Sequence, residues 1–389
     1  DTGKMFKETA WQATYIAEYF HFYAGAADKI HGDTLPIDKP DMFVFTDREP
    51  IGVVAAVIPW NSQMFLTAVK VGPALAAGNT IVLKASEHAS APLLEFGKLI
   101  AKAGIPDGVV NIITGGAEPC GRVLTSHPSV AKVAFTGGPT AARHIVRNAA
   151  ENFAEVSLEL GGKSPFIVFD DADLDAAVEG ALNSKFRNSG QTCVCANRLY
   201  VQAGIYDAFA TAFAKRVESL KVGDAFEEGV TQGPLINANA LKKVEELVAD
   251  ARDKGAIAAT GGKPHELGGL YYQPTVLRDV PLNARVLKEE IFGPVAPLIK
   301  FETEEEVINL ANDSEFGLAG YFFARDIGRV WRVAEALECG IVGVNEGITS
   351  AVEAPFGGVK QSGLGREGSH YGLDDYMEVK YVLMGGLGK

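Results

Sequence analysis

The chain has 389 residues, which is too long for one compact core and predicts two or three domains. Its net charge of −13 argues against binding to nucleic acid, which needs a basic surface, whereas 47% apolar and 22% charged residues are ordinary for a globular protein. Four cysteines do not make a disulfide framework and favour a cytoplasmic location, and no apolar run reaches the ~20 residues of a membrane span.

The first half of the chain alternates between two patterns. After a helical start without signal-peptide features, short apolar runs rich in β-branched residues predict buried strands. Between them lie stretches such as 90–104, whose apolar residues are spaced by three and four as in a helix. This alternation indicates βαβ units and a parallel sheet. The predicted strands are 51–58, 80–84, 108–114, 130–136 and 154–160.

The pattern then restarts. Residues 164–169 predict a strand, 173–186 a helix that begins with acidic residues, and 198–202 the next strand. Two other segments, 41–50 and 374–384, alternate like exposed strands, and we expect them to pair as a small appendage.

A parallel sheet suggests a nucleotide site, although the G-x-G-x-x-G fingerprint is absent. The stretch FTGGPTAAR (135–143) has a strand, a glycine pair and a helix start, whose N–H groups and dipole suit a phosphate. A glycine pair before a helix is also what a plain tight turn contains, so the residues alone leave both interpretations open.

Two cysteines, Cys193 and Cys195, lie in the loop SGQTCVCANR (189–198), between a predicted helix and a predicted strand. A reactive cysteine needs exposure and a lowered pKa, and a loop of small polar residues offers the exposure. A metal site is not expected, because no nearby Cys or His completes four ligands. A thiol hydrolase would need a partner histidine, and none of the seven histidines stands in a sequence context that marks it as that partner.

These residues, with LELGGKSP (158–165) placing Glu159 34 positions before Cys193, resemble the aldehyde dehydrogenase superfamily. The resemblance covers essentially the whole chain, and several further motifs occur in the same order. Members usually begin about a hundred residues earlier, so we expect this chain to lack an N-terminal segment. The supporting motifs are PWN (59–61), KASE (84–87), EEIFGP (289–294) and PFGGVKQSGLGRE (355–367).

The resemblance implies an α/β fold with three parts. A Rossmann-like NAD-binding domain would comprise 1–38 and 52–160, and an α/β catalytic domain 161–356. The strands 39–51 and 373–389 would serve oligomerisation, which predicts a homodimer or homotetramer.

The resemblance also assigns the chemistry. Cys193 matches the nucleophile, which would form a thiohemiacetal with the aldehyde, and Asn61 matches the donor to its oxyanion. Loss of hydride to the nicotinamide would leave a thioester, and Glu159 matches the general base for its hydrolysis. Lys70 and Glu367 match positions thought to carry protons away from Glu159, although each could equally be a plain charged residue.

Cofactor residues follow by the same matching. Lys84 would bind the adenosine ribose beside Glu87, and because a carboxylate repels a 2′-phosphate, we predict NAD rather than NADP, with NADP still possible. Family members often have Ser at position 138 and Gly at 142, so Gly138 and Ala142 could weaken pyrophosphate binding. The remaining predicted cofactor contacts are Ile58, Pro59, Trp60, Gly137, Leu160, Glu290 and Phe292.

The segments around Cys193 and after Gly347 resemble the succinate-semialdehyde branch of the family, in which an arginine six positions before the cysteine binds the substrate carboxylate. Here that residue is Arg187, which could also be a helix-terminal charge, and Ser350 could assist. The branch usually supplies a second arginine where this chain has Val69. With Phe65 and Phe186 also apolar, uncharged aldehydes are an alternative substrate class.

Three expectations stay open on the sequence alone. Cys195 could form a reducible disulfide with Cys193 that switches activity off, or it could be a bystander. The same nucleophile could act as an esterase with weak cofactor use. A non-catalytic binding protein is a third possibility, but Asn61, Glu159 and Cys193 are all retained.

Overall fold

The computed structural model describes residues 1–386 and divides into two units, each treated separately below. Unit 1 comprises residues 1–11, 159–350 and 357–364, and unit 2 comprises the rest of the chain. In this division the chain passes from unit 2 to unit 1 between residues 158 and 159, and residues 1–11 group with unit 1; the predicted assignment of domains stays a prediction. Within 1–386, no helix is long and apolar enough to cross a membrane.

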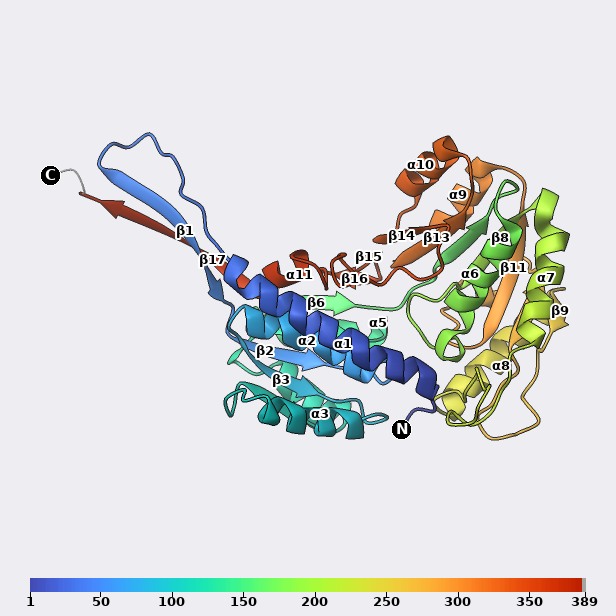
Figure 1. Ribbon diagram of the computed structural model, residues 1–389, viewed down its shortest axis with the longest axis horizontal. Helices are drawn as coiled ribbons and strands as arrows, with labels where there is room; N and C mark the ends of the chain where they lie inside the picture. The colour runs from blue at the N-terminus through green and yellow to red at the C-terminus, as the bar shows by residue number, and fades with distance from the viewer. Residues whose placement is uncertain (387–389) are drawn as a thin grey trace. The chain divides into compact units, whose positions relative to one another are not determined.

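Unit 2 is built on a sheet with the strand order β6-β5-β2-β3-β4, and β5, β2, β3 and β4 run parallel (Figure 1). The buried apolar runs of the sequence form these strands with ends within two residues of the predicted ones. Aromatic residues of α1 and apolar residues of α2 pack against β2 and β3 in one core. The elements are α1 (Phe6–Ala26), β2 (Val53–Val57), α2 (Gln63–Ala76), β3 (Thr80–Lys84), α3 (Ala91–Lys102), β4 (Val110–Ile113), α4 (Val123–Thr125), β5 (Val130–Thr136), α5 (Pro139–Ala149), β6 (Glu155–Glu159) and α11 (Tyr371–Asp374).

The order of these strands creates a switch point. From β2 the chain adds β3 and β4 on one side, and it then returns to add β5 on the other side. Ligands of open α/β sheets bind at such a point, outside the carboxyl ends of the strands. Here those ends lead into Ile58–Asn61 after β2 and into Gly137–Gly138 after β5.

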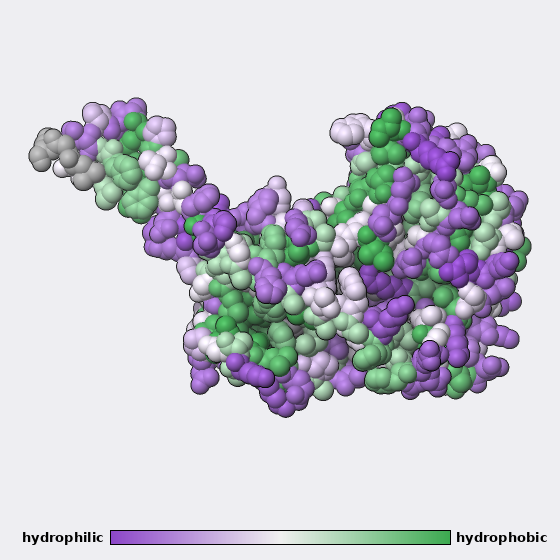
Figure 2. All heavy atoms as spheres, in the orientation of Figure 1, coloured by the Kyte–Doolittle hydropathy of each residue, from purple (hydrophilic) through white to green (hydrophobic). Residues whose placement is uncertain are grey.

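The predicted appendage is an antiparallel ribbon of β1 (Met42–Pro50) and β17 (Met377–Gly385), in register from Met42 opposite Gly385 to Pro50 opposite Met377. Figure 2 shows apolar and polar side chains interleaved on it. Val379 and Tyr381 are among its exposed apolar residues. The assembly role of this ribbon stays a prediction, and the last three residues of its predicted second segment, 387–389, lie outside the described part of the chain.

Unit 1 contains a larger sheet with the order β14-β13-β7-β8-β11-β10-β9, parallel except for β9. Phe166 and Val168 of β7 face a core with α6 and α7, whereas Ile167 faces a second core with α8, α9 and α10. Because both faces are covered, these strands are continuous apolar runs. The elements are β7 (Pro165–Val168), α6 (Leu174–Phe186), β8 (Arg198–Gln202), α7 (Tyr206–Glu218), α8 (Ala238–Asp253), β9 (Ile257–Thr260), β10 (Thr275–Arg278), β11 (Val295–Phe301), α9 (Glu304–Asn312), β12 (Phe316–Gly317), β13 (Ala319–Phe323), α10 (Ile327–Ala336), β14 (Ile341–Val344), β15 (Val359–Lys360) and β16 (Gly363–Leu364).

Candidate active site

The predicted catalytic and cofactor residues of unit 1 gather at one edge of its sheet. Glu159 and Leu160 precede β7, Cys193 precedes β8, and Glu290 and Phe292 precede β11. Since these strands are parallel, their amino ends lie at the same edge and bring the three loops together. This edge is opposite to the carboxyl edge where open α/β sheets usually bind ligands.

The backbone before Cys193 is held in an uncommon conformation. Asn188, Ser189 and Gly190 all have positive φ, at 49°, 53° and 76°. Side-chain hydrogen bonds fix it: the Ser189 hydroxyl donates to the Gly233 carbonyl at 2.9 Å, and the Gln191 amide oxygen accepts from the Ile236 N–H at 2.9 Å. Strain of this kind persists only where surrounding contacts enforce it, and it is common at functional sites.

The glycine pair after Glu159 serves close packing. A Cβ at Gly162 would lie 2.8 Å from the Cys193 carbonyl oxygen, and one at Gly161 would lie 2.6 Å from the Glu290 carboxylate. The Gly162 N–H donates to that carboxylate at 3.0 Å. The LELGG motif therefore lets the segment that follows Glu159 approach both the cysteine loop and Glu290.

Two supporting residues were missed by the sequence analysis. The Asn197 amide oxygen accepts from the Ile291 N–H at 3.1 Å, and its NH2 donates to the Cys195 carbonyl at 2.8 Å, so Asn197 ties the cysteine loop to the Glu290 loop. The buried Lys163 ammonium donates to the Val286 carbonyl at 2.6 Å. Their partners are distant in sequence, and the only signal was a polar residue at the start of a buried strand.

The environment of Cys193 differs from the expected one. Cys193 is half-buried. Desolvation raises its pKa above the ordinary value, and the charges of Glu290 and Glu159 add to the rise. Burial also raises the pKa of Glu290, opposed by its hydrogen bond from the Gly162 N–H. The lowered thiol pKa that a reactive cysteine was expected to show is therefore absent from the free protein.

This difference predicts the pH dependence of alkylation. A raised pKa means that the neutral thiol dominates at pH 7 to 8, so the iodoacetamide rate at Cys193 should rise about tenfold per pH unit and show no plateau below pH 9. Mass spectrometry of the Cys193 peptide measures this rate. Glu290→Gln should accelerate it, and a plateau below pH 8 in the cofactor-free protein would contradict the prediction.

Cys195 is buried, and both cysteines of the loop are free thiols. Burial raises the Cys195 pKa, while Lys185 opposes the rise. The proposed switch between the two sulfurs stays a prediction.

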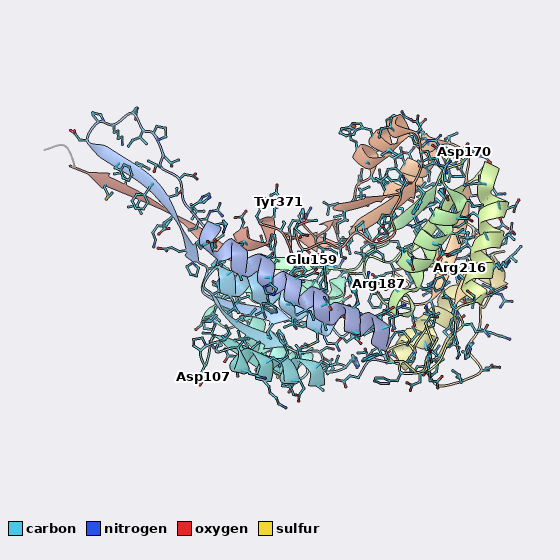
Figure 3. All side chains as sticks on the ribbon, viewed as in Figure 1. Asp107, Glu159, Asp170, Arg187, Arg216 and Tyr371 are labelled. Carbon is cyan, nitrogen blue, oxygen red and sulfur yellow. The ribbon has the colours of Figure 1, made fainter. Side chains whose placement is uncertain are left out.

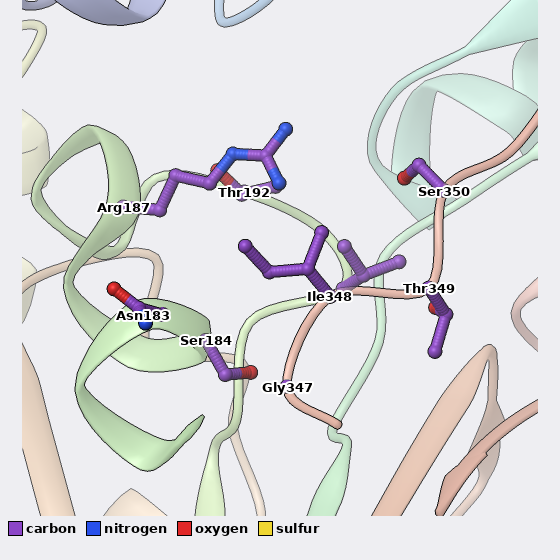
Figure 4. A pocket seen from close by; sticks show the side chains of 9 residues that line it. Asn183, Ser184, Arg187, Thr192, Gly347, Ile348, Thr349 and Ser350 are labelled. Carbon is purple, nitrogen blue, oxygen red and sulfur yellow. The ribbon is translucent and has the colours of Figure 1, made fainter. Parts of the chain in front are cut away.

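A pocket beside the cysteine loop joins two of the predicted substrate residues (Figure 4). Arg187 extends over it from the end of α6, and the loop that carries Ser350 forms the opposite wall. Figure 3 labels Arg187 on the ribbon, and the residue belongs to unit 1. The pocket is partly open to solvent. Its other lining residues are Asn183, Ser184, Thr192, Val194, Gly347, Ile348 and Thr349.

Unit 2 carries the predicted cofactor residues at the carboxyl edge of its sheet. Lys84 ends β3, is buried, and has its ammonium 3.7 Å from a Glu87 oxygen, while Glu87 is exposed. A Cβ at Gly137 would overlap the Phe135 ring, which would have to shift, and Gly138 precedes α5 with open space around it. Ala142, in the first turns of α5, is buried.

The PWN motif follows β2 directly. The Ile58 N–H donates to the Lys84 carbonyl at 3.0 Å, which places the two predicted cofactor segments side by side. Pro59 and Trp60 are half-buried, and Asn61 is buried just before α2. The donation from Asn61 to the oxyanion stays a prediction.

The predicted proton-carrying residues form an ion pair inside unit 2. The fully buried Lys70 ammonium contacts the Glu367 carboxylate and donates to the Thr136 hydroxyl at 2.8 Å. The pair is therefore structural as well as a candidate for proton transfer. Of the apolar substrate candidates, Val69 lies in the unit 2 core, and Phe65 stacks on Tyr15 with ring centroids 5.4 Å apart.

These features fit a dinucleotide. A switch point, a helix start after a glycine pair, and a lysine beside a carboxylate supply the donors and acceptors that phosphate and ribose groups need. Within residues 1–386, no group of three or more His, Cys, Asp or Glu side chains could hold a metal ion.

Comparisons with known proteins agree with this geometry. The model of the aldehyde dehydrogenase family matches residues 1–382. Glutarate-semialdehyde dehydrogenase of Pseudomonas aeruginosa is 53% identical over 387 residues, covering 100% of this chain and 80% of that protein. The succinate-semialdehyde dehydrogenase (NADP(+)) GabD of Escherichia coli is 54% identical over 385 residues, covering 99% and 80%. The crystal structure of an E. coli NADP-dependent enzyme matches with a TM-score of 0.98 at 53% identity, covering 99% of this chain and 80% of that one.

Proposed function

The chain belongs to the aldehyde dehydrogenase family, and we propose that it oxidises a short aldehyde carrying a terminal carboxylate, of the succinate- or glutarate-semialdehyde class, to the dicarboxylic acid. The observation that supports this substrate class is the pocket that joins Arg187 to Ser350 beside the cysteine loop. A guanidinium can bind a carboxylate through two parallel hydrogen bonds, and Thr192 and Ser350 add hydroxyl donors.

The roles of the chain's own residues follow from their chemistry. The Cys193 thiolate forms a bond to the aldehyde carbon while the carbonyl electrons move onto the oxygen, which Asn61 and the Cys193 N–H would stabilise. When bound, a nicotinamide dinucleotide would supply the oxidant, because its ring can accept a hydride. Glu159 accepts a proton from the water that attacks the resulting thioester. The carbon–sulfur bond then breaks, which releases the acid and the thiolate.

The cofactor would bind along the carboxyl edge of unit 2, with Lys84 at the ribose and the α5 start at the phosphates, and Glu290 would hold the second ribose. Glu87 argues for NAD+, because its exposed carboxylate repels a 2′-phosphate. Two of the relatives carry NADP in their names, so this chain would differ from them in selectivity.

A matrix of initial rates tests the proposal. Wild-type protein is assayed with NAD+ and with NADP+, on succinate semialdehyde, hexanal and benzaldehyde. Arg187→Gln should lower kcat/KM for succinate semialdehyde about ten- to a hundredfold, because one charge-assisted hydrogen-bonding partner is lost, and should leave hexanal within about threefold.

Two outcomes would overturn parts of the proposal. Equal specificity constants for the acid and the uncharged aldehydes would favour the broad-specificity alternative, in which the apolar Ile348 of the pocket contacts the substrate. A preference for NADP+ of tenfold or more would reject the role given to Glu87.

A further inference from the structure

The guanidinium of Arg187 has an aromatic neighbour that no motif predicts. Its central carbon lies over the Trp11 ring, 5.6 Å from the centroid. Trp11 is in the first part of α1 and belongs to unit 1, as Arg187 does. The indole is 50% exposed, so its packing does not explain why a tryptophan stands there.

The backbone next to Arg187 fixes this geometry. The Glu8 carboxylate accepts a hydrogen bond from the Asn188 N–H at 3.0 Å, which ties the start of α1 to the residue after Arg187. Two residues earlier, the Phe6 N–H donates to the Ala225 carbonyl at 3.3 Å. The Trp11 ring is therefore held in place relative to the arginine by contacts on the segment that carries it.

The charges around Arg187 leave it available to a substrate. Within residues 1–386, no carboxylate forms an ion pair with Arg187. The Glu8 carboxylate accepts its hydrogen bond from the backbone N–H of Asn188, the residue after Arg187. Burial lowers the pKa of Lys4 to about 8, Glu8 opposes the drop, and repulsion from the nearby Arg187 adds to it. An aromatic face holds a cation without neutralising it, whereas a carboxylate would compete with the substrate.

We infer that Trp11 is a positioning residue for acid aldehydes: its ring holds the Arg187 guanidinium over the pocket while leaving the donor edge of the guanidinium open. This inference rests on the proposed function, because it gives Arg187 the carboxylate of the substrate. Holding a long side chain in one arrangement before binding removes part of the ordering cost of binding. The effect should appear with charged substrates and be absent with neutral ones.

The experiment compares Trp11→Leu, which removes the aromatic ring, with Trp11→Phe, which keeps one. In Trp11→Leu, KM for succinate semialdehyde should rise about three- to tenfold at nearly constant kcat, and kcat/KM for hexanal should stay within about twofold. Trp11→Phe should recover most of the lost affinity. Trp331→Leu, the same change at a 68% exposed position of α10, is the matched control and should alter neither substrate.

A double-mutant cycle separates the inference from the proposed function. If Trp11 acts through Arg187, Trp11→Leu should have no further effect in the Arg187→Gln background. An additive effect there, or an equal loss with both aldehydes, would overturn the role of Trp11 even if Arg187→Gln is selective. If Arg187→Gln itself does not discriminate between the aldehydes, the proposed function fails and the inference fails with it. Unfolding midpoints of all variants identify any effect that comes from lost folding.

Discussion

Cys193→Ala is expected to lower aldehyde oxidation by at least about 10⁴-fold, because loss of a covalent nucleophile removes the whole route through the thioester. The change is small in volume, and the loop does not depend on the sulfur. Its backbone is held by Gln191, Ser189 and Asn197, whose hydrogen bonds do not involve the thiol. NADH formation from succinate semialdehyde, with unfolding followed in parallel, measures the effect.

Cys195→Ala is the matched control for this prediction. It removes the other sulfur of the same loop, two residues away and buried, and under reducing conditions activity should stay within a few-fold of wild type. Nitrophenyl acetate separates the competing function. If Cys193→Ala loses ester cleavage and the wild type shows no aldehyde oxidation with either cofactor, the protein acts as an esterase. Retention of more than about 1% of oxidation would remove Cys193 from the nucleophile role.

The strands were predictable because a parallel sheet covered on both faces demands continuous apolar runs. Residues 80–84, 130–136 and 198–202 are strands with the same bounds in the structure as in the sequence analysis. The ribbon of β1 and β17 was predictable for a different reason, since its alternating pattern marks strands that are open to solvent. What the pattern could not supply is strand order, which depends on packing between distant segments.

The site was predictable only as far as its residues carry motifs. Glu159, Cys193 and Glu290 stand in recognisable segments, but Asn197 and Lys163 act through backbone groups of other loops, which leave no trace in local sequence. Trp11 and Arg187 are separated along the chain by residues 12–158 of unit 2, so local sequence does not reveal their contact. The loop composition suggested an exposed Cys193, whereas desolvation is the main cause of its raised pKa, and local sequence reveals neither that burial nor the two nearby carboxylates.

Gly190→Ala is the second large effect we expect. Gly190 has a φ of 76°, a conformation that costs an L-residue about 1–2 kcal/mol, and an added Cβ would overlap the Gly293 carbonyl. Because the obstacle is backbone, relief requires one of two loops to move, either the loop of Cys193 or the loop of Glu290 and Phe292. We expect a loss of stability of about 2–4 kcal/mol and a loss of kcat/KM of about a hundredfold, since a displacement near 1 Å at the nucleophile costs that much.

The two substrates and a second glycine make this prediction specific. Both succinate semialdehyde and hexanal should lose rate equally, because the displaced group is the nucleophile and not Arg187, which is the opposite of the pattern expected for Arg187→Gln. Gly25→Ala is the control: Gly25 is in α1 with no atom within 4 Å of an added Cβ, so alanine there should be neutral or stabilise by about 0.5–1 kcal/mol. A Gly190→Ala protein with wild-type Tm and rates would mean that the left-handed turn before Cys193 does not set the position of the sulfur.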